Sequence, residues 1–236
     1  MTGPSSTALH HHLWPADGEA RGAFLVVHGL SEHGGRYAGL ARTANSAGYE
    51  VAAVDLYGHG RSPGKRGHVR AFESDHLRAV DELVREAERR DPGRPAFLFG
   101  HSLGGLIAAR WAQSRVFARR LHGLVLLAPF VEPAMPVPGW KRGAARLLSA
   151  LLPSFTLPTG IEDASVFREP AERDAYGADP LVQRRISALH WAELGRERAR
   201  LRERAPELDL PTLVQLAGDD RVVSTPASLA FARRLP

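Results

Sequence analysis

The stretch FGHSLGG, residues 99–105, places a serine between two glycines in the order Gly100-His101-Ser102-Leu103-Gly104. The apolar run AFLFG (96–100) precedes the serine, and LGGLIAARWAQ (103–113) follows it with the composition of a helix. Gly-x-Ser-x-Gly between a strand and a helix is typical of a sharp turn that holds a serine hydroxyl clear of the sheet. The stretch therefore predicts a nucleophile elbow at Ser102 with φ above zero, rather than a merely structural turn. It also raises the question of which base activates the hydroxyl.

Short apolar runs alternate with helical segments around this stretch. The runs are AFLVV (23–27), EVAAVD (50–55), AFLFG (96–100), GLVLLAP (123–129) and LVQLAG (213–218). Runs that are apolar throughout, rather than at every second position, are typical of parallel strands covered on both faces. Segments 36–47 and 74–90, and the segment after Ser102, have helical periodicity. The pattern predicts an α/β fold, a mostly parallel sheet with flanking helices.

The alternation stops after residue 130. Residues 131–160 contain five prolines and one short apolar helix at 144–152, and residues 181–203 are predicted as further helix. We expect a helical cap insertion at 132–205, between a first part of the core (1–131) and a second part (206–236). Apolar cap residues either line an acyl groove or pack the cap onto the core: Leu147, Leu148, Leu151, Leu152 and Phe155.

Acyl transfer needs hydrogen-bond donors for the oxyanion of the tetrahedral intermediate. The backbone N–H of Leu103, directly after the nucleophile, is one candidate. The loop His28-Gly29-Leu30 follows the first apolar run, and the N–H of Leu30 is the second candidate. Glu32 and Arg36 either form a pair that braces this loop or face solvent.

Four motifs, in this order along the chain, resemble the monoacylglycerol lipase and lysophospholipase group of α/β-hydrolase serine enzymes. They are HGLSEHGGRY (28–37), DLYGHGRSPGKRGH (55–68), GHSLGG (100–105) and LAGDDRVV (216–223). The cap segments LPTGIEDAS (157–165) and ADPLVQRRISALHWAEL (178–194) are also similar. The resemblance begins near residue 13. It implies the α/β-hydrolase fold, a triad in the order Ser, Asp, His, and glycerol or lysolipid esters as substrates.

Carried onto this sequence, the resemblance makes Ser102 the nucleophile and Leu30 and Leu103 the oxyanion pair. It places the acid at Asp220 rather than Asp219, because a residue and then an apolar pair follow Asp220. Glu132 is a weaker candidate for the acid.

No histidine follows Asp220 in the sequence. The expectation is therefore that the catalytic histidine is absent from this chain, that the last strand and helix of the fold are missing, and that hydrolysis is impaired. His101 is adjacent to Ser102 but should point away from it. His28 is expected to orient the oxyanion loop, His59 to belong to a turn, and His190 to belong to the cap.

Neither a cofactor nor a metal site is expected. The run His10-His11-His12 has the residue type of a weak metal tract, but it stands isolated near one end of the sequence. Asp55 is predicted to brace a loop rather than to act as a second catalytic acid.

The composition excludes several classes of protein. The 236 residues include no cysteine, which excludes disulfides and thiolate chemistry, and the formal net charge is +5. Arginines alternate with acidic residues, as in RERARLRERAPE (196–207), so solvated helix faces are favoured over a nucleic-acid surface. No membrane-spanning run and no signal peptide are evident, and a cytoplasmic location is expected. Transient contact with a membrane surface through the cap stays open, as does the oligomeric state.

These features together predict a serine carboxylic-ester hydrolase acting on a small lipid ester. Two alternatives remain. The first is a non-catalytic hydrolase-fold protein that binds an acyl ligand, and the second is another hydrolase-fold enzyme such as a peptidase or haloperoxidase.

Overall fold

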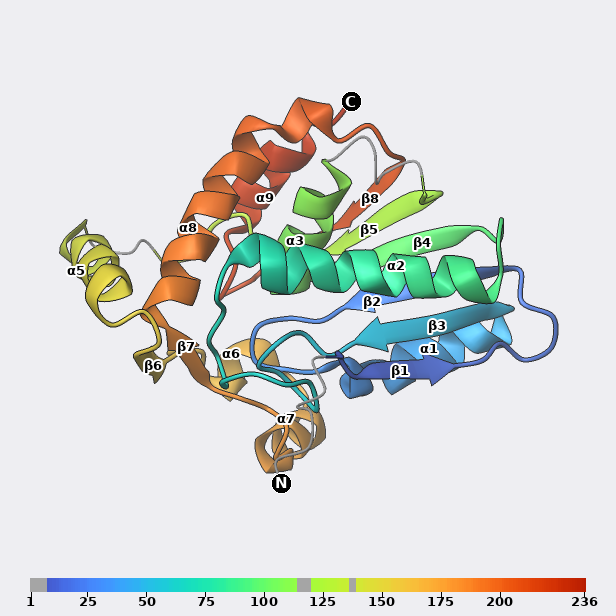
Figure 1. The fold of residues 1–236 in the computed structure, drawn as a ribbon, viewed down its shortest axis with the longest axis horizontal. Coiled ribbons are helices and arrows are strands. Elements are labelled where there is room, and N and C mark those ends of the chain that lie inside the picture. Colours follow the sequence, from blue (N-terminus) through green and yellow to red (C-terminus); the bar gives the residue numbers. More distant parts are fainter. Residues whose placement is uncertain (1–7, 114–119, 136–138) are drawn as a thin grey trace, which may run out of the picture.

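The computed structural model describes residues 8–113, 120–135 and 139–236. At its centre lies a six-stranded sheet in the order β1-β3-β2-β4-β5-β8 (Figure 1). The strands are β1 (His11–Trp14), β2 (Gly22–Val27), β3 (Tyr49–Val54), β4 (Ala96–His101), β5 (Gly123–Leu127) and β8 (Thr212–Gln215). β1 runs antiparallel to β3, and the other neighbours in this sheet are parallel. The predicted α/β fold with a mostly parallel sheet is confirmed, and β1 is a strand that the sequence pattern did not indicate.

Helices cover both faces of this sheet (Figure 1). On one face, the 3₁₀ turn η1 (Gly34–Tyr37) leads into α1 (Ala38–Ser46), whose Ala41 packs with Val26 and Val51. The other face carries the larger core, to which α3 (Leu103–Ala112) contributes along its whole length. The π-helical turn η2 (Glu73–Leu77), α2 (Arg78–Arg90), α8 (Ala188–Glu203) and α9 (Thr225–Ala232) complete that layer. Strands buried on both faces explain the continuous apolar runs.

The segment between β5 and β8 leaves the sheet. It forms α5 (Gly139–Leu151), β6 (Thr156–Pro158), α6 (Asp163–Val166), α7 (Pro170–Ala178) and β7 (Arg185–Ser187) before α8, and the short turn η3 (Ala205–Glu207) follows α8. β6 and β7 pair antiparallel as a small separate sheet. The helix expected at 144–152 begins earlier, at Gly139. The helix expected over 181–203 begins only at Ala188, because Ser187 caps it by accepting a hydrogen bond from His190 N.

α8 packs directly on the core. Leu194 and Leu201 of this helix are fully buried in the core cluster. Arg110 of α3 donates to Glu197 over 2.8 Å, and Gln113 donates to the Leu201 carbonyl over 3.0 Å. The part of the excursion that extends away from the sheet is therefore α5 to β7, and α5 stands at its outer edge (Figure 1).

Across the described ranges, none of the helices combines the length and apolar character needed to cross a bilayer.

Candidate active site

Ser102 occupies a strained turn between β4 and α3. Its φ is 52° and its ψ is −114°, a conformation that costs an ordinary residue about 1–3 kcal/mol. Hydrogen bonds hold the turn in place: Ser102 N donates to the Leu127 carbonyl over 2.9 Å, and the Ser102 carbonyl accepts from Phe130 N over 2.9 Å. The predicted positive φ at Ser102 is confirmed.

The glycines beside Ser102 are required by close backbone contacts. A Cβ on Gly104 would lie 2.0 Å from the Val27 carbonyl oxygen, and a Cβ on Gly100 would lie 2.4 Å from the Gly104 carbonyl oxygen. A Cβ on Gly105 would lie 2.9 Å from Pro129. Any side chain at these positions would force α3 away from β2 and β5, so the motif reflects packing at the elbow.

The loop after β2 runs beside the elbow and is anchored from below by His28. This imidazole is fully buried, and its Nδ1 lies 2.7 Å from the Gly29 carbonyl oxygen. Leu56 N donates to His28 Nε2 over 3.0 Å, so the ring is neutral with its proton on Nδ1. Burial lowers the pKa of His28, which keeps the ring in that form. His28 therefore orients the loop, as the sequence predicted.

Glu32 connects this loop to the elbow. Its Oε1 accepts from Gly29 N over 2.6 Å and from the Tyr37 hydroxyl over 2.9 Å. The same oxygen lies 2.8 Å from Nδ1 of His101, the residue before Ser102. The loop is thus braced by Glu32, but Arg36 is not the partner that the sequence suggested.

Charge in this cluster is balanced between Glu32 and His101. Burial alone would raise the pKa of Glu32, but the adjacent His101 and the hydrogen bonds lower it to about 2. Burial alone would lower the pKa of His101, but the charge of Glu32 and the hydrogen bond to it raise it, and Asp220 adds to the increase. The pair favours a carboxylate facing an imidazolium.

The carbonyl of Leu30 is held from two directions. His59 Nε2 lies 2.6 Å from this oxygen, and Gln183 Nε2 donates to it over 3.0 Å. His59 is buried, and burial together with the nearby His28 lowers its pKa to about 3, so it is neutral. His59 therefore does more than complete a turn, because it fixes the loop that carries the Leu30 N–H.

The segment 167–183 covers the same loop from outside. The Tyr176 hydroxyl donates to the Ser31 carbonyl over 2.7 Å, and Asp179 Oδ2 lies 2.9 Å from His33 Nε2. Arg36 lies 3.6 Å from Asp179 and 4.9 Å from the centroid of the Tyr176 ring. Sequence reasoning missed Tyr176, Asp179 and Gln183 as residues of the site. The similarity of 178–194 to the family cap includes Asp179 and Gln183 but not Tyr176.

Asp220 follows β8 in a tight turn. Its Oδ1 accepts from Val222 N and Val223 N, each over 2.8 Å. Asp220 is half-buried, whereas Asp219 is exposed. The loop after β5 pairs with this turn through a bridge between Pro133 and Val223. The turn therefore lies at the carboxyl ends of β5 and β8, the same edge of the sheet to which the carboxyl end of β4 brings Ser102.

The other acidic candidates have structural partners. Glu132 pairs with Arg198 over 2.5 Å and also with Arg202, both from α8. Asp55 is fully buried and accepts from Gly34 N over 2.7 Å and from Arg61 N over 2.8 Å. Asp55 therefore braces loops, as predicted.

The histidine rings point to other partners. His76 and His190 face each other with their Nε2 atoms 3.1 Å apart, and His68 contacts Ser187. His101 is held by Glu32. Within the described part of the chain, none of the histidine rings forms a hydrogen bond with the Ser102 hydroxyl.

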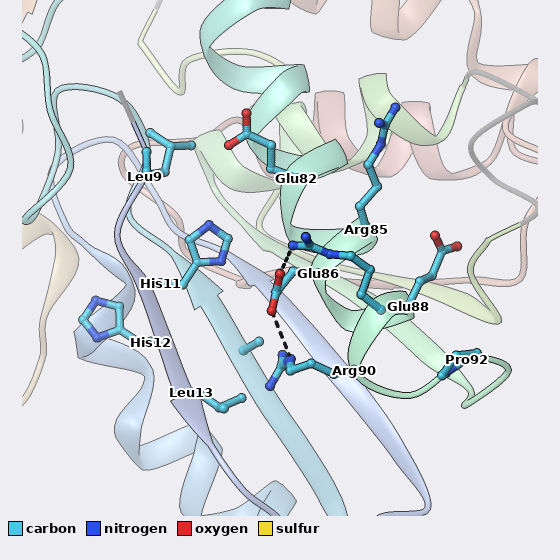
Figure 2. Close-up of a pocket in the computed structure, with 13 residues that line it drawn as sticks. Leu9, His11, His12, Leu13, Glu82, Arg85, Glu86, Glu88, Arg90 and Pro92 are labelled. Atoms are coloured by element: carbon cyan, nitrogen blue, oxygen red, sulfur yellow. Dashed lines mark hydrogen bonds and ion pairs between the residues drawn. The ribbon is translucent and has the colours of Figure 1, made fainter. Parts of the chain in front are cut away.

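A pocket of about 940 Å³ lies between β1 and α2, away from Ser102 and the loop after β2. Figure 2 shows His11 beside Glu82 and Glu86 of α2 there, with Arg90 further along the groove. Its lining includes no residue of the elbow or of the loop after β2, so this groove is not part of the candidate active site.

Four features together define an α/β-hydrolase-fold serine hydrolase. They are the mostly parallel sheet, the strained serine at the β4–α3 turn, the anchored loop after β2 and the aspartate after β8. Residues 18–236 match the serine aminopeptidase S33 family, and the chain belongs to this family. The expected resemblance to the monoacylglycerol lipase group and the expected α/β-hydrolase fold are thereby confirmed.

Individual relatives agree. A phospholipase of Bacillus subtilis is 32% identical over 89% of this chain and 80% of its own. The human monoglyceride lipase is 35% identical over 91% of this chain and 70% of its own. The crystal structure of the monoacylglycerol lipase of Paleococcus ferrophilus matches with a TM-score of 0.86 and 32% identity, covering 97% of this chain and 84% of that chain. These similarities identify the chain as a monoglyceride-lipase-like carboxylic ester hydrolase.

Proposed function

We propose that Ser102 is the nucleophile of an acyl-enzyme mechanism, with Asp220 as the acid of its triad. The positive φ of Ser102 at the first turn of α3 is the observation that carries this proposal. The first N–H groups of a helix have no partner within the helix, so the Leu103 N–H is available to an oxyanion. The Leu30 N–H is the second donor, on a loop that His28, Glu32 and His59 fix in place.

In this mechanism the Ser102 oxygen attacks the ester carbonyl carbon, and its proton passes to a base. The carbonyl oxygen becomes an oxyanion, to which each N–H donor contributes about 3–4 kcal/mol. Collapse breaks the bond to the alcohol, which leaves with the proton, and water then hydrolyses the acyl-enzyme by the same route.

The base is a separate part of the proposal. A histidine after Asp220 would be expected to supply it, and this sequence contains none. We therefore expect the 236-residue chain to hydrolyse esters slowly. Loss of one triad member leaves roughly 10³–10⁴-fold catalysis over water from binding and the oxyanion donors.

The substrate class proposed is a monoacylglycerol or lysophospholipid ester. It is supported by the names of the relatives, one a phospholipase and others monoglyceride or monoacylglycerol lipases. The family description also includes aminopeptidases, so esters and aminoacyl amides belong in the same assay.

The segment over the site is proposed to be a cap that meets a lipid surface. Because α8 packs on α3, we place the cap proper at 139–187, a shorter segment than the expected 132–205. Four of the five apolar residues that were expected to line a groove or to pack inward are exposed instead: Leu147, Leu151, Leu152 and Phe155. Exposed apolar groups gathered on α5 and the residues directly after it are typical of an interaction surface.

The test combines labelling with turnover. A fluorophosphonate probe should label the chain, and Ser102→Ala should not be labelled. Hydrolysis of p-nitrophenyl butyrate and 1-monooleoylglycerol should exceed that of aminoacyl p-nitroanilides. Free imidazole should raise the rate by supplying a base, after subtraction of the rate that imidazole gives with Ser102→Ala.

The outcomes separate the candidate functions. Binding of monoacylglycerol without labelling or turnover would favour the non-catalytic acyl-binding protein. A preference for aminoacyl amides would favour a peptidase. The chain could also show ordinary esterase rates without imidazole, and these rates could disappear when one of its histidines is substituted. That result would refute the proposal that the catalytic base is missing.

A further inference from the structure

Three ligating side chains gather on one face of the sheet edge, on the side of α1. His12 also borders the groove of Figure 2, but its ring points to the other side of β1. In β1, His11 pairs in register with Val54 of β3, so His10 lies opposite Asp55 in the continuation of the two strands. The hydrogen bond from Asp55 N to the His10 carbonyl, 2.8 Å long, fixes that pairing. Residues two apart on a strand share a face, and so do residues paired across strands. His10, His12 and Asp55 therefore face the same way.

The ligand atoms of these residues are close. His12 Nε2 lies 3.0 Å from Asp55 Oδ1, and one ligand atom from each of the three residues lies within 4.8 Å of the other two. The His10 and His12 rings meet edge to face with centroids 4.6 Å apart. Opposite ligands on one ion lie about 4.2 Å apart, so closure needs only a shift of a few tenths of an ångström. The half-buried His10 ring has room to make it.

We propose that His10, His12 and Asp55 form a binding site for a divalent transition-metal ion, with Cu²⁺ preferred. Two imidazoles with one carboxylate suit copper, nickel and zinc. Two atoms 3.0 Å apart that each lie about 2.0–2.1 Å from an ion subtend roughly 90–100°. That angle fits the tetragonal geometry of Cu²⁺ better than the tetrahedral geometry of Zn²⁺. The ion takes the place of the hydrogen between His12 Nε2 and Asp55 Oδ1, so the neutral His12 ring that binds it carries its single N–H proton on Nδ1.

The surroundings hold the ligands in place. Asp55 is fully buried, and Gly34 N and Arg61 N fix its two oxygens. The His12 ring stacks on Trp14 with centroids 5.6 Å apart and an interplanar angle of 9°. Backbone donors and packing that orient ligands are what a metal site requires beyond the ligands themselves. The nearby His33 is committed elsewhere, since its Nε2 contacts Asp179 and its Nδ1 accepts from Gly35 N.

His11 gives a matched control within the same run of three histidines. Figure 2 shows the His11 and His12 rings on opposite sides of β1, and the His11 ring lies in the groove beside α2. A site built by the fold needs His10 and His12 but not His11. A flexible histidine tract would use all three alike.

The experiment is titration of the 236-residue chain with CuCl₂ by calorimetry, beside His10→Gln, His12→Gln and His11→Gln. We expect one site, about tenfold or more weaker binding in the first two variants, and less than twofold change in His11→Gln. Electron paramagnetic resonance of the wild-type complex should show a tetragonal Cu²⁺ with nitrogen and oxygen ligands, and His11→Gln should give the same spectrum. Since this spectrum is recorded on the wild-type chain, misfolding of a ligand variant does not remove the test.

Equal weakening by all three substitutions would overturn the proposal, as would a wild-type affinity no higher than that of His12→Gln. A spectrum that changes in His11→Gln would do the same.

Discussion

At the scale of single residues, Glu32 joins the loop after β2 to the turn at Ser102. One oxygen of this carboxylate accepts hydrogen bonds from Gly29 N and the Tyr37 hydroxyl and lies within hydrogen-bond distance of the His101 ring. The charge of Glu32 matters as well as its shape, because the anion keeps the pKa of His101 raised against the effect of burial. Glu32 is a positioning residue, since it acts through the loop and through His101.

Glu32→Gln tests that role. The amide keeps the size of the side chain but removes the charge, so the Gly29–Leu30 loop should loosen and the pKa of His101 should fall. Because loss of one oxyanion donor costs about 10²–10³ in rate, a displaced donor should slow fluorophosphonate labelling of Ser102 about tenfold or more. The labelling rate and the NMR titration of His101 are the measurements. Glu19→Gln, at an exposed turn, is the control. Unchanged labelling together with an unchanged His101 pKa would exclude the role.

At the scale of elements, the parts that the sequence predicted well are those whose local pattern and packing agree. β2, β4 and β5 are apolar throughout because they are buried on both faces, and α3 follows a turn whose glycines have no room for side chains. β1 was missed because it is a four-residue edge strand, HHLW, whose apolar run is only two residues long and whose Leu13 is exposed.

The site was less predictable because its contacts come from distant segments. Glu32 and Arg36 have the spacing of a helical ion pair, but residues 34–37 form a 3₁₀ turn and Arg36 turns toward Tyr176. Gln183 reaches Leu30 across 153 positions of sequence, and no local periodicity encodes such a contact.

The contact between η2 and α8 predicts acid sensitivity. His76 and His190 are fully buried with their Nε2 atoms 3.1 Å apart, and His76 Nδ1 has no partner among the described residues. Burial, with His190, His59 and His28 nearby, holds the pKa of His76 well below its ordinary value. Burial also lowers the pKa of His190 to about 4, with His68 lowering it further, and the Gly67 carbonyl and Asp75 opposing.

Proton linkage determines how the folding stability changes with pH. Between about pH 6.5 and pH 4 the unfolded histidines bind protons and the folded ones do not, so stability falls as pH falls. Each such histidine contributes a slope of at most about 1.4 kcal/mol per pH unit. His76→Gln should reduce the slope by about one histidine's share. Urea unfolding at a series of pH values across this range measures the slope for the wild-type chain and for His76→Gln. A flat profile in the wild-type chain would contradict the prediction.

At the scale of the whole molecule, the exposed apolar surface is unevenly distributed. The edge of α5 and the residues after it carry large exposed side chains, with Leu147 62% and Leu151 67% exposed. Figure 1 places α5 at the outer edge of the molecule, beyond α8 and away from the sheet. A lipid ester released from a bilayer would meet this side of the molecule if α5 rests on the membrane.

Leu147→Glu and Leu151→Glu should therefore weaken binding to phosphatidylcholine vesicles. Burying a leucine side chain is worth about 1.5–3 kcal/mol, so each substitution should reduce partitioning about tenfold or more. Leu213→Glu is the matched control, because Leu213 is 61% exposed but lies on β8 outside the cap. Vesicle co-sedimentation measures partitioning, and hydrolysis of soluble p-nitrophenyl butyrate should stay at the wild-type rate in all three variants, since none of them touches Ser102 or the oxyanion loop. If Leu213→Glu lowers partitioning as much as the cap substitutions, binding to vesicles reflects general exposed hydrophobicity and the cap has no special role at the membrane.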